Sequence, residues 1–297
     1  MHSTDEQTAG RTIDFSVHER IPPVSIGMPV YNGVKSIRQA LDSLLSQTFS
    51  DFVIVVSDNA SNDGTSDILQ EYALRDPRII YIKQSANIGA EANFKFVFHA
   101  TKSKYFMWAA ADDIRSPNFI ERNFQFLEND PAYLASTLQT KFKGRGFDEI
   151  LMGDRSLDQD DFAQRLISFF QSWHANGRFY SLFRRRAIDP WINDNWEFLG
   201  SDWSLVTGIA SMGKLNRIDD GWVELGRDGT SNSTNFIARY RKGLLGWMMP
   251  FHRLTAETWR LMEPAKPSQR LYLAWRLTNL NLRAFVAQFV LMFSRRM

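Results

Sequence analysis

Between residues 23 and 127, short apolar segments alternate four times with segments of helical periodicity, and the connections between them are short. The apolar segments are 23–30, 52–57, 79–82 and 105–109. The second segment is continuously apolar, as expected of a strand that is covered on both faces. This alternation predicts an α/β domain with a mostly parallel sheet, right-handed crossovers and helices on both faces of the sheet.

Two adjacent carboxylates, Asp112 and Asp113, follow the fourth apolar segment. They lie just past the C-terminal end of the predicted strand, at the edge of a parallel sheet where ligands bind. Because adjacent acids repel each other, we expect a cation to neutralise them. Oxygen ligands favour Mn²⁺ or Mg²⁺, which bridge to substrate phosphates through one or two carboxylates. The alternative is a solvated turn into a helix, with Ser116 as N-cap and Pro117 as the first helical residue.

Several classes of protein are excluded by what the sequence lacks. There is no cysteine, which rules out disulfides and thiolate metal sites and fits a cytoplasmic location. The first predicted turn carries neither a dinucleotide-binding glycine fingerprint nor a P-loop, which argues against a nicotinamide dehydrogenase and a P-loop NTPase. Residues 1–20 are mostly polar with no apolar core, so we expect a disordered tail and no secretory signal.

The C-terminal segment, residues 236–297, is expected to be helical, aromatic and basic. From Arg239 to the end the chain has eleven Lys or Arg and two Asp or Glu, whereas the whole chain has a net charge of +2. Residues 268–296 have a helical pattern, in which Arg276, Asn279 and Arg283 share one face. The apolar face comprises Leu271, Trp275, Leu282, Phe285, Phe289 and Phe293.

This helix either packs on the protein's own core or lies in the plane of an anionic membrane surface. We favour the membrane surface because basic charge accompanies the aromatic residues, and we expect no nucleic-acid partner. No apolar run reaches the roughly 20 residues that span a bilayer.

Four segments resemble, in order and spacing, the motifs of the family 2 glycosyltransferases. They are Val24–Asn32, Ser57–Thr65, Asn87–Gly89 followed by Asn93, and Ala111–Asp113. The resemblance implies a GT-A fold, Rossmann-like, over residues 21–235, with a nucleotide-binding half at 21–130 and an acceptor-binding half at 131–235. It also implies inverting transfer of one sugar from a nucleotide-diphosphate donor of the UDP, GDP or dTDP type.

The resemblance assigns roles to individual residues. Asp113 would bind the metal, and Asp112 would bind the ribose or share the metal. Many relatives carry a further acid at the position of Ala110, so metal coordination stays open here. Asp58 would accept a hydrogen bond from the base or ribose, with an Asx turn as its alternative. The other expected nucleotide-pocket residues are Pro29, Tyr31, Asn32 and Asn87, of which Asn87 either contacts the nucleotide or holds its loop.

An inverting transfer needs a general base, and Asp202 is expected to fill this role. Glu197 is the alternative base, and a helix cap is the alternative role for Asp202 or Ser201. The residues expected to contact the acceptor or the diphosphate are His174, Arg178, Tyr180, Arg184 and Arg227, each with a surface or structural alternative.

The expected function is therefore metal-assisted transfer of one sugar to a glycan or lipid-linked glycan. A Gln-x-x-Arg-Trp motif, typical of processive synthases of the family, is absent. We expect a role in cell-surface polysaccharide biosynthesis, with the protein cytoplasmic and peripheral on the inner face of the membrane. The alternatives are a catalytically degenerate scaffold or binding protein and, less favoured, a sugar-nucleotide nucleotidyltransferase.

Overall fold

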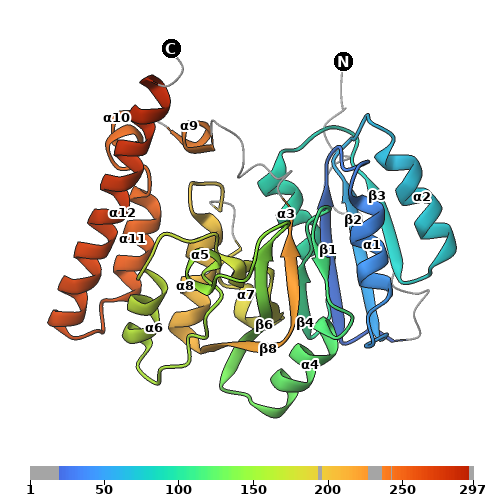
Figure 1. Ribbon diagram of the computed structural model, residues 1–297, viewed down its shortest axis with the longest axis horizontal. Helices are drawn as coiled ribbons and strands as arrows, with labels where there is room; N and C mark the ends of the chain where they lie inside the picture. Colours follow the sequence, from blue (N-terminus) through green and yellow to red (C-terminus); the bar gives the residue numbers. More distant parts are fainter. Residues whose placement is uncertain (1–19, 193–195, 227–235, 242, 294–297) are drawn as a thin grey trace, which may run out of the picture.

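The computed structural model describes residues 20–192, 196–226, 236–241 and 243–293 and contains one mixed sheet flanked by helices (Figure 1). The strands are β1 (Val24–Val30), β2 (Phe52–Asp58), β3 (Ile79–Lys83), β4 (Tyr105–Trp108), β5 (Ile114–Arg115), β6 (Tyr133–Phe142), β7 (Leu182–Arg184) and β8 (Lys214–Leu225). They pair in the order β3-β2-β1-β4-β7-β6-β8-β5. The α/β fold with a helical C-terminal segment is thus confirmed.

The sheet has a parallel half and a mixed half. Strands β1 to β4 are parallel, with β1 in the middle between β2 and β4. Strand β7 is antiparallel to both β4 and β6, whereas β6 and β8 are parallel to each other. The predicted parallel sheet therefore extends over the first 108 residues, and one reversed strand joins it to the second half.

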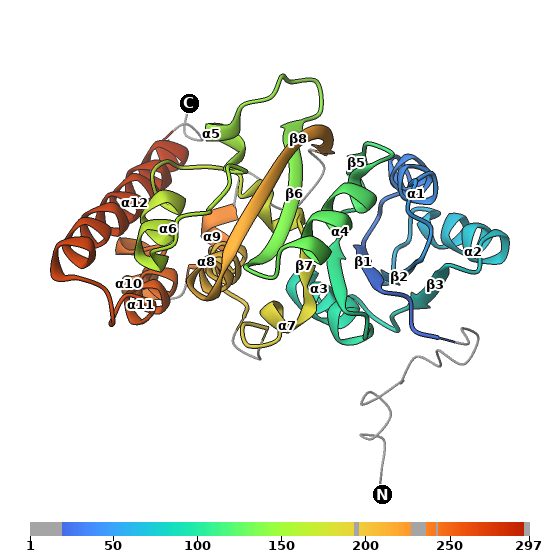
Figure 2. The ribbon, with the colours of Figure 1, turned by 90° about the horizontal axis from the view of Figure 1, so that it is seen from below.

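Helices cover both faces of the sheet and continue beyond its end. They are α1 (Ile37–Leu45), α2 (Thr65–Arg75), α3 (Ala90–His99), α4 (Phe119–Asn129), α5 (Glu149–Met152), α6 (Phe162–Phe169), the 3₁₀ helix η2 (Gly177–Tyr180), α7 (Arg185–Ile188), α8 (Ser201–Met212), α9 (Phe236–Tyr240), α10 (Gly243–Met248), α11 (His252–Leu261) and α12 (Pro267–Phe293). Figures 1 and 2 show α10, α11 and α12 at the end of the molecule opposite α1 and α2.

Two hydrophobic cores lie on the two faces of the sheet, and β4 contributes to both. Tyr105 and Met107 pack with α1, α2 and α4, whereas Phe106 and Trp108 pack with α3, α6, α8, α11 and α12. This is the alternation expected of a strand covered on both faces. The C-terminal helices are therefore part of the second core.

Two helices have N-caps other than the residues considered from the sequence. Helix α4 begins at Phe119 with Asn118 as N-cap, two residues after the predicted start at Pro117, and the Gln47 side chain accepts a hydrogen bond from the free N–H of Ile120 (2.9 Å). Helix α8 has Gly200 as N-cap, with φ +85°, so neither Ser201 nor Asp202 caps it. The first turn of α4 is thus satisfied by the side chain of the distant Gln47, and α8 begins after a glycine instead of a polar cap.

None of the described helices combines the length and the apolar character that crossing a bilayer requires. The predicted tail at 1–20 lies, apart from Arg20, outside the described residues. The four predicted apolar segments match β1 to β4 to within one residue at each end.

Candidate active site

The turn after β1 is bound to the loop after β2. Asn32 adopts the left-handed conformation (φ 53°), its N–H donates to Ser61 Oγ (2.9 Å), and its Oδ1 accepts from the N–H of Asn62 (3.0 Å). Tyr31, beside it, is half exposed, and Pro29 is half-buried. Tyr31 and Asn32 are thus both exposed to a possible ligand, and Asn32 also holds the turn.

Asp58 is fully buried at the end of β2, and its carboxylate is already hydrogen-bonded within the protein. It accepts from the N–H of Ser61 (2.9 Å), from Ser66 Oγ (2.5 Å) and from the Tyr81 hydroxyl (3.3 Å). This placement supports the Asx-turn alternative for Asp58 and does not support direct contact with the base or ribose.

The loop before α3 is held by Asn59, which the sequence analysis did not select. Its Nδ2 donates to Asn87 Oδ1 (2.9 Å) and to the Gly89 carbonyl (3.1 Å), and its Oδ1 accepts from the N–H of Ile88 (2.8 Å). Asn87 also accepts from the N–H of Gly89 (2.9 Å), so Asn87 shapes its own loop. The position of Asn59 directly after Asp58 was the available signal.

The acid pair lies at the end of β4, against the end of β8. Asp113 is buried, and its Oδ1 accepts from the N–H of Gly226 (3.1 Å). Its Oδ2 lies 3.9 Å from Arg115 Nη2 and has no hydrogen-bond partner among the described residues. Asp112 is half-buried, and a Cβ on Gly226 would lie 2.0 Å from Asp112 Oδ2. A glycine is therefore needed where β8 passes the pair.

Burial raises the pKa of Asp113 to about 6, because desolvation disfavours its charged form. The positive charge of Arg115 opposes this shift, and the negative charge of Asp112 adds to it. An acid pair with one buried oxygen lacking a partner fits a divalent cation. The described residues contain no cluster of three or more potential metal ligands, so diphosphate oxygens would have to complete the coordination.

Asp202 stands at the first turn of α8. Its Oδ2 accepts from Asn176 Nδ2 (3.0 Å), and desolvation raises its pKa, which this hydrogen bond opposes. Asn176 is buried in the left-handed conformation (φ 55°), and its Oδ1 has no partner among the described residues. The alternative base, Glu197, is exposed.

Tyr180 connects the acid pair with Asp202. Burial raises the pKa of Tyr180 well above its ordinary value. The negative charges of Asp113, Asp112 and Asp202 raise this pKa further, in that order. The acid pair and Asp202, about 90 residues later in the sequence, thus act electrostatically on the same phenol, which indicates that the end of β4 and the start of α8 belong to one region of the molecule.

His174 is a structural residue. Its Nδ1 accepts from the N–H of Asn176 (3.0 Å), its Nε2 is 3.0 Å from the Phe169 carbonyl, and its ring stacks on Trp203 at 4.3 Å. Burial and the charge of Arg178 lower the pKa of His174 to about 3, so the ring is neutral near pH 7. This neutral ring fixes the turn that presents Asn176 to Asp202.

Arg178 and Arg184 are also buried, and both bind backbone carbonyls. Arg178 Nε donates to the Arg155 carbonyl (2.8 Å), and its Nη1 donates to the Gly153 carbonyl. Arg184 Nε donates to the Tyr133 carbonyl (2.8 Å). This placement favours the structural alternative for His174, Arg178 and Arg184. Arg227 lies outside the described residues.

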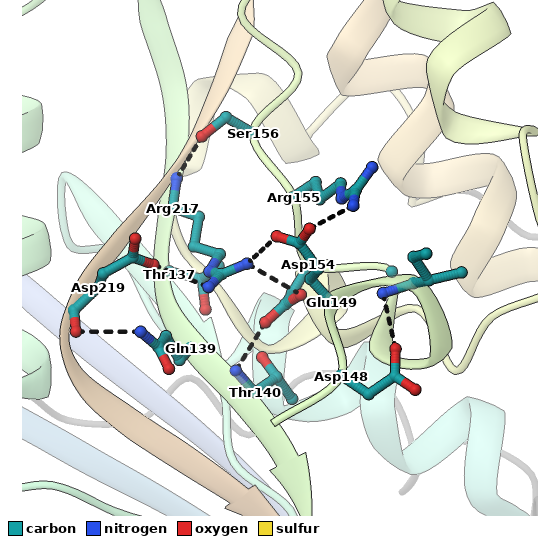
Figure 3. Close-up of polar contacts among 12 residues, drawn as sticks. Thr137, Gln139, Thr140, Asp148, Glu149, Asp154, Arg155, Ser156, Arg217 and Asp219 are labelled. Atoms are coloured by element: carbon teal, nitrogen blue, oxygen red, sulfur yellow. Dashed lines mark hydrogen bonds and ion pairs between the residues drawn. The ribbon is translucent and has the colours of Figure 1, made fainter. Parts of the chain in front are cut away.

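Arg178 donates to carbonyls of the segment 148–156, and a polar network joins this segment to β6 and β8 (Figure 3). Arg217 lies 2.7 Å from Glu149, 3.8 Å from Asp154 and 2.8 Å from Asp219. Asp154 Oδ2 accepts from the N–H of Thr140 (2.7 Å). Residues 148–156 are thus fixed on the sheet, and they in turn fix η2, which carries Tyr180.

Helix α9 links the C-terminal segment to the start of α3. Arg239 Nη2 lies 2.9 Å from Glu91 Oε2, and the Tyr240 hydroxyl donates to Glu91 Oε1. Burial and Glu91 raise the pKa of Tyr240, and the charge of Asp202 contributes to the same shift. Helix α9 is therefore anchored on α3 through Glu91, and Asp202 is near enough to affect the pKa of Tyr240.

A parallel half joined by a reversed strand to a mixed half, with an acid pair at the end of β4, is the architecture of a GT-A glycosyltransferase. Residues 25–191, more than half of the chain, match the model of Glycosyl transferase family 2, and the chain belongs to that family.

Relatives and solved structures agree with this class. An uncharacterised glycosyltransferase of Methanocaldococcus jannaschii is 36% identical over 111 residues, which are 37% of this chain and 38% of the relative. Chondroitin synthase of Escherichia coli is 33% identical over 110 residues, 37% of this chain and 16% of that protein. The chain thus spans less than half of the length of these relatives.

Two solved structures share the fold. S. aureus TarS in complex with UDP-GlcNAc has a TM-score of 0.58 at 17% identity, covering 72% of this chain and 63% of that one. The mannosyltransferase PcManGT from Pyrobaculum calidifontis, in complex with GDP-Man and Mn²⁺, has a TM-score of 0.58 at 16% identity, covering 93% and 75%. The chain therefore belongs to Glycosyl transferase family 2 and has the fold of these solved structures.

Proposed function

We propose that this glycosyltransferase transfers one sugar from a nucleotide-diphosphate donor to a glycan or lipid-linked glycan acceptor, with inversion at the anomeric carbon. The observation that carries the proposal is a buried acid, Asp113, with one oxygen lacking a hydrogen-bond partner among the described residues, together with a separate carboxylate, Asp202, held by Asn176. A donor-side acid pair and a separate carboxylate are what an inverting transfer needs, because the leaving group and the attacking hydroxyl lie on opposite sides of the anomeric carbon.

Asp202 acts as the general base in this proposal. Its carboxylate takes the proton of the acceptor hydroxyl while that oxygen attacks the anomeric carbon and the bond to the diphosphate breaks. The raised pKa of Asp202 suits this task, because a base works best when its pKa lies nearer the working pH. Asn176 holds the carboxylate in place through its 3.0 Å hydrogen bond.

Asp112 and Asp113 would hold Mn²⁺ or Mg²⁺, which neutralises the departing diphosphate when it is bound. The partnerless Oδ2 of Asp113 and the half-buried Asp112 support this assignment. Tyr31 lines the nucleotide side, since it is exposed at the end of β1. The donor is a UDP, GDP or dTDP sugar, in keeping with the nucleotides in the complexes of TarS and PcManGT.

We place the reaction in cell-surface polysaccharide biosynthesis, in the cytoplasm and at the inner face of the membrane, where lipid-linked acceptors are found. The basic C-terminal segment supports this location. A catalytically degenerate scaffold is the second candidate, favoured by Ala110 and by the lack of a third metal-ligand side chain in the described part of the site.

The test is thermal unfolding with a panel of nucleoside diphosphates, with and without Mn²⁺, followed by release of nucleoside diphosphate from the matching sugar donor. A ligand at 100 times its Kd stabilises the fold by about 2.7 kcal/mol. We expect a metal-dependent shift for one base, its loss in Asp113→Asn, and its retention in Asp202→Asn, which should abolish transfer. A shift with no turnover under any condition would support the scaffold, and no shift at all would refute the donor site.

A further inference from the structure

Helix α12 has two apolar sides, and only one of them faces the protein. Its inner side is formed by Leu273, Leu277, Leu280 and Ala284, all buried in the core shared with α6, α8 and α11. The predicted alternative of packing on the protein's own core is therefore what the structure has, but through residues other than the predicted face.

The outer side of α12 carries a second apolar stripe. Leu271 is 74% exposed, Trp275 55%, Leu282 56% and Val286 51%. At 3.6 residues per turn these four positions fall within roughly 60° of arc, directly opposite the buried side. Three of them belong to the predicted apolar face; Phe285 is half-buried, and the side chains of Phe289 and Phe293 lie outside the described residues. No described part of the fold covers this outer stripe.

Basic and aromatic side chains border the outer stripe. Arg283 is exposed, and the Arg276 guanidinium lies 5.0 Å from the Tyr272 ring and 4.9 Å from the Trp275 ring. From Arg239 to the end, the sequence has eleven basic residues and only two acidic ones. One of those acids, Glu257, is turned inward and accepts a hydrogen bond from Ser204. Arg276 and Arg283 therefore give the border of the stripe a positive charge.

A second exposed apolar group lies on α10, which packs on α12 through Trp247 and Phe285 (5.0 Å between rings). Its exposed residues are Leu244 (72%), Leu245 (56%) and Met248 (54%). Figure 1 places α9, α10 and the C-terminal end of α12 at the upper edge of the molecule, the edge toward which β6 and β8 run. The apolar group on α10 is thus on the same side as the ends of the strands that carry the site.

We propose that the outer stripe of α12, with α10, docks on an anionic lipid bilayer and turns the sugar-transfer site toward a lipid-linked acceptor. Exposed Leu and Val insert among acyl chains, Trp and Tyr prefer the interface, and Arg pairs with anionic headgroups. A nucleic acid would leave four adjacent apolar side chains without a partner. The role given to the acceptor rests on the proposed function, whereas docking itself does not.

The experiment is flotation of the full chain with vesicles of phosphatidylcholine alone or with one quarter phosphatidylglycerol. We expect at least tenfold stronger binding to the anionic vesicles, weakened by salt. Leu271→Ser with Leu282→Ser should reduce it at least tenfold. The matched control is Leu74→Ser, which changes a leucine that is 89% exposed on α2, and it should bind as the wild type does.

The proposal is overturned by equal loss in the Leu74→Ser control, or by absence of vesicle binding. It is also overturned if the protein binds oligonucleotides and not vesicles. A third contrary result would be a dimer that binds no vesicles and that the double substitution converts to monomers. Nucleotide-induced thermal shifts, measured without vesicles, separate the two proposals. A shift without vesicle binding refutes docking alone, and vesicle binding without any nucleotide shift refutes the donor site alone.

Discussion

The hydrogen bond from Asn176 to Asp202 makes a quantitative prediction about the pH dependence of transfer. The substitution is Asn176→Gly, because Asn176 has φ 55° and glycine keeps this backbone conformation at no steric cost. The variant therefore removes the side-chain amide from Asp202 and leaves the turn that His174 supports. An alanine at this position would add strain and confuse the result.

A hydrogen bond to a charged group contributes about 1.5–3 kcal/mol. The Asn176 amide stabilises the charged form of Asp202, so its loss should raise the pKa of Asp202 further. Since the base of the proposed reaction must be ionised, the acidic limb of kcat/KM should move to higher pH. Activity should fall about 10- to 100-fold below the limb and recover in part above it.

The assay is the pH profile of nucleoside diphosphate release from the donor identified by thermal shift. Asn216→Ala is the control, because it removes another half-buried amide, one bonded to Ser136 on β6 (3.4 Å). An unshifted acidic limb with a uniform loss of kcat would show that Asn176 supports only the fold. Such a result would refute the inference that it tunes Asp202.

Three further outcomes are expected. Gly226→Ala should abolish the metal-dependent thermal shift with nucleotide, because its Cβ would lie 2.0 Å from Asp112 Oδ2. The control is Gly146→Ala, whose Cβ would have no atom within 4 Å and which should keep the shift. Equal shifts in both variants would contradict the geometry. Mn²⁺ affinity, measured by calorimetry with nucleotide present, should fall about tenfold per pH unit below about pH 6, as protons compete for Asp113; a flat profile would be the opposing result. The pKa of His174 is lowered to about 3, so below about pH 6.5 the unfolded state binds a proton at His174 that the folded state does not, and the free energy of unfolding falls as the pH falls. In denaturant titrations, His174→Phe should remove up to about 1.4 kcal/mol per pH unit of this fall. An unchanged slope would argue against a neutral ring.

The strands and the acid pair could be predicted because they depend on local patterns. Continuous apolar runs such as 52–57 specify a strand covered on both faces wherever the chain goes next. The chain then carries Asp112 and Asp113 past the end of β4 by connectivity alone. Asp202 was expected from the family resemblance, and the structure places it in the first turn of α8.

What could not be predicted depends on partners far along the chain. An aspartate at position 58 suits either a nucleotide contact or a turn. In the fold, the hydroxyls of Ser66 and Tyr81 donate to its carboxylate, which favours the structural role. Arg178 and Arg184 extend to carbonyls 23 to 57 residues away, and no local pattern records such contacts. In α12 both apolar sides satisfy a helical period, and packing against α6 and α11 selects the inner one.

The contact at Gly200 has a consequence for how the chain can be divided. Phe251, the N-cap of α11, and Leu254 lie 3.1 Å from the position of a Cβ on Gly200, the N-cap of the helix that carries Asp202. Cutting the chain near residue 235 would therefore expose the apolar contacts at this N-cap rather than release an independent anchor. The C-terminal helices and the first turn of α8 have to be kept together in any shortened form of the protein.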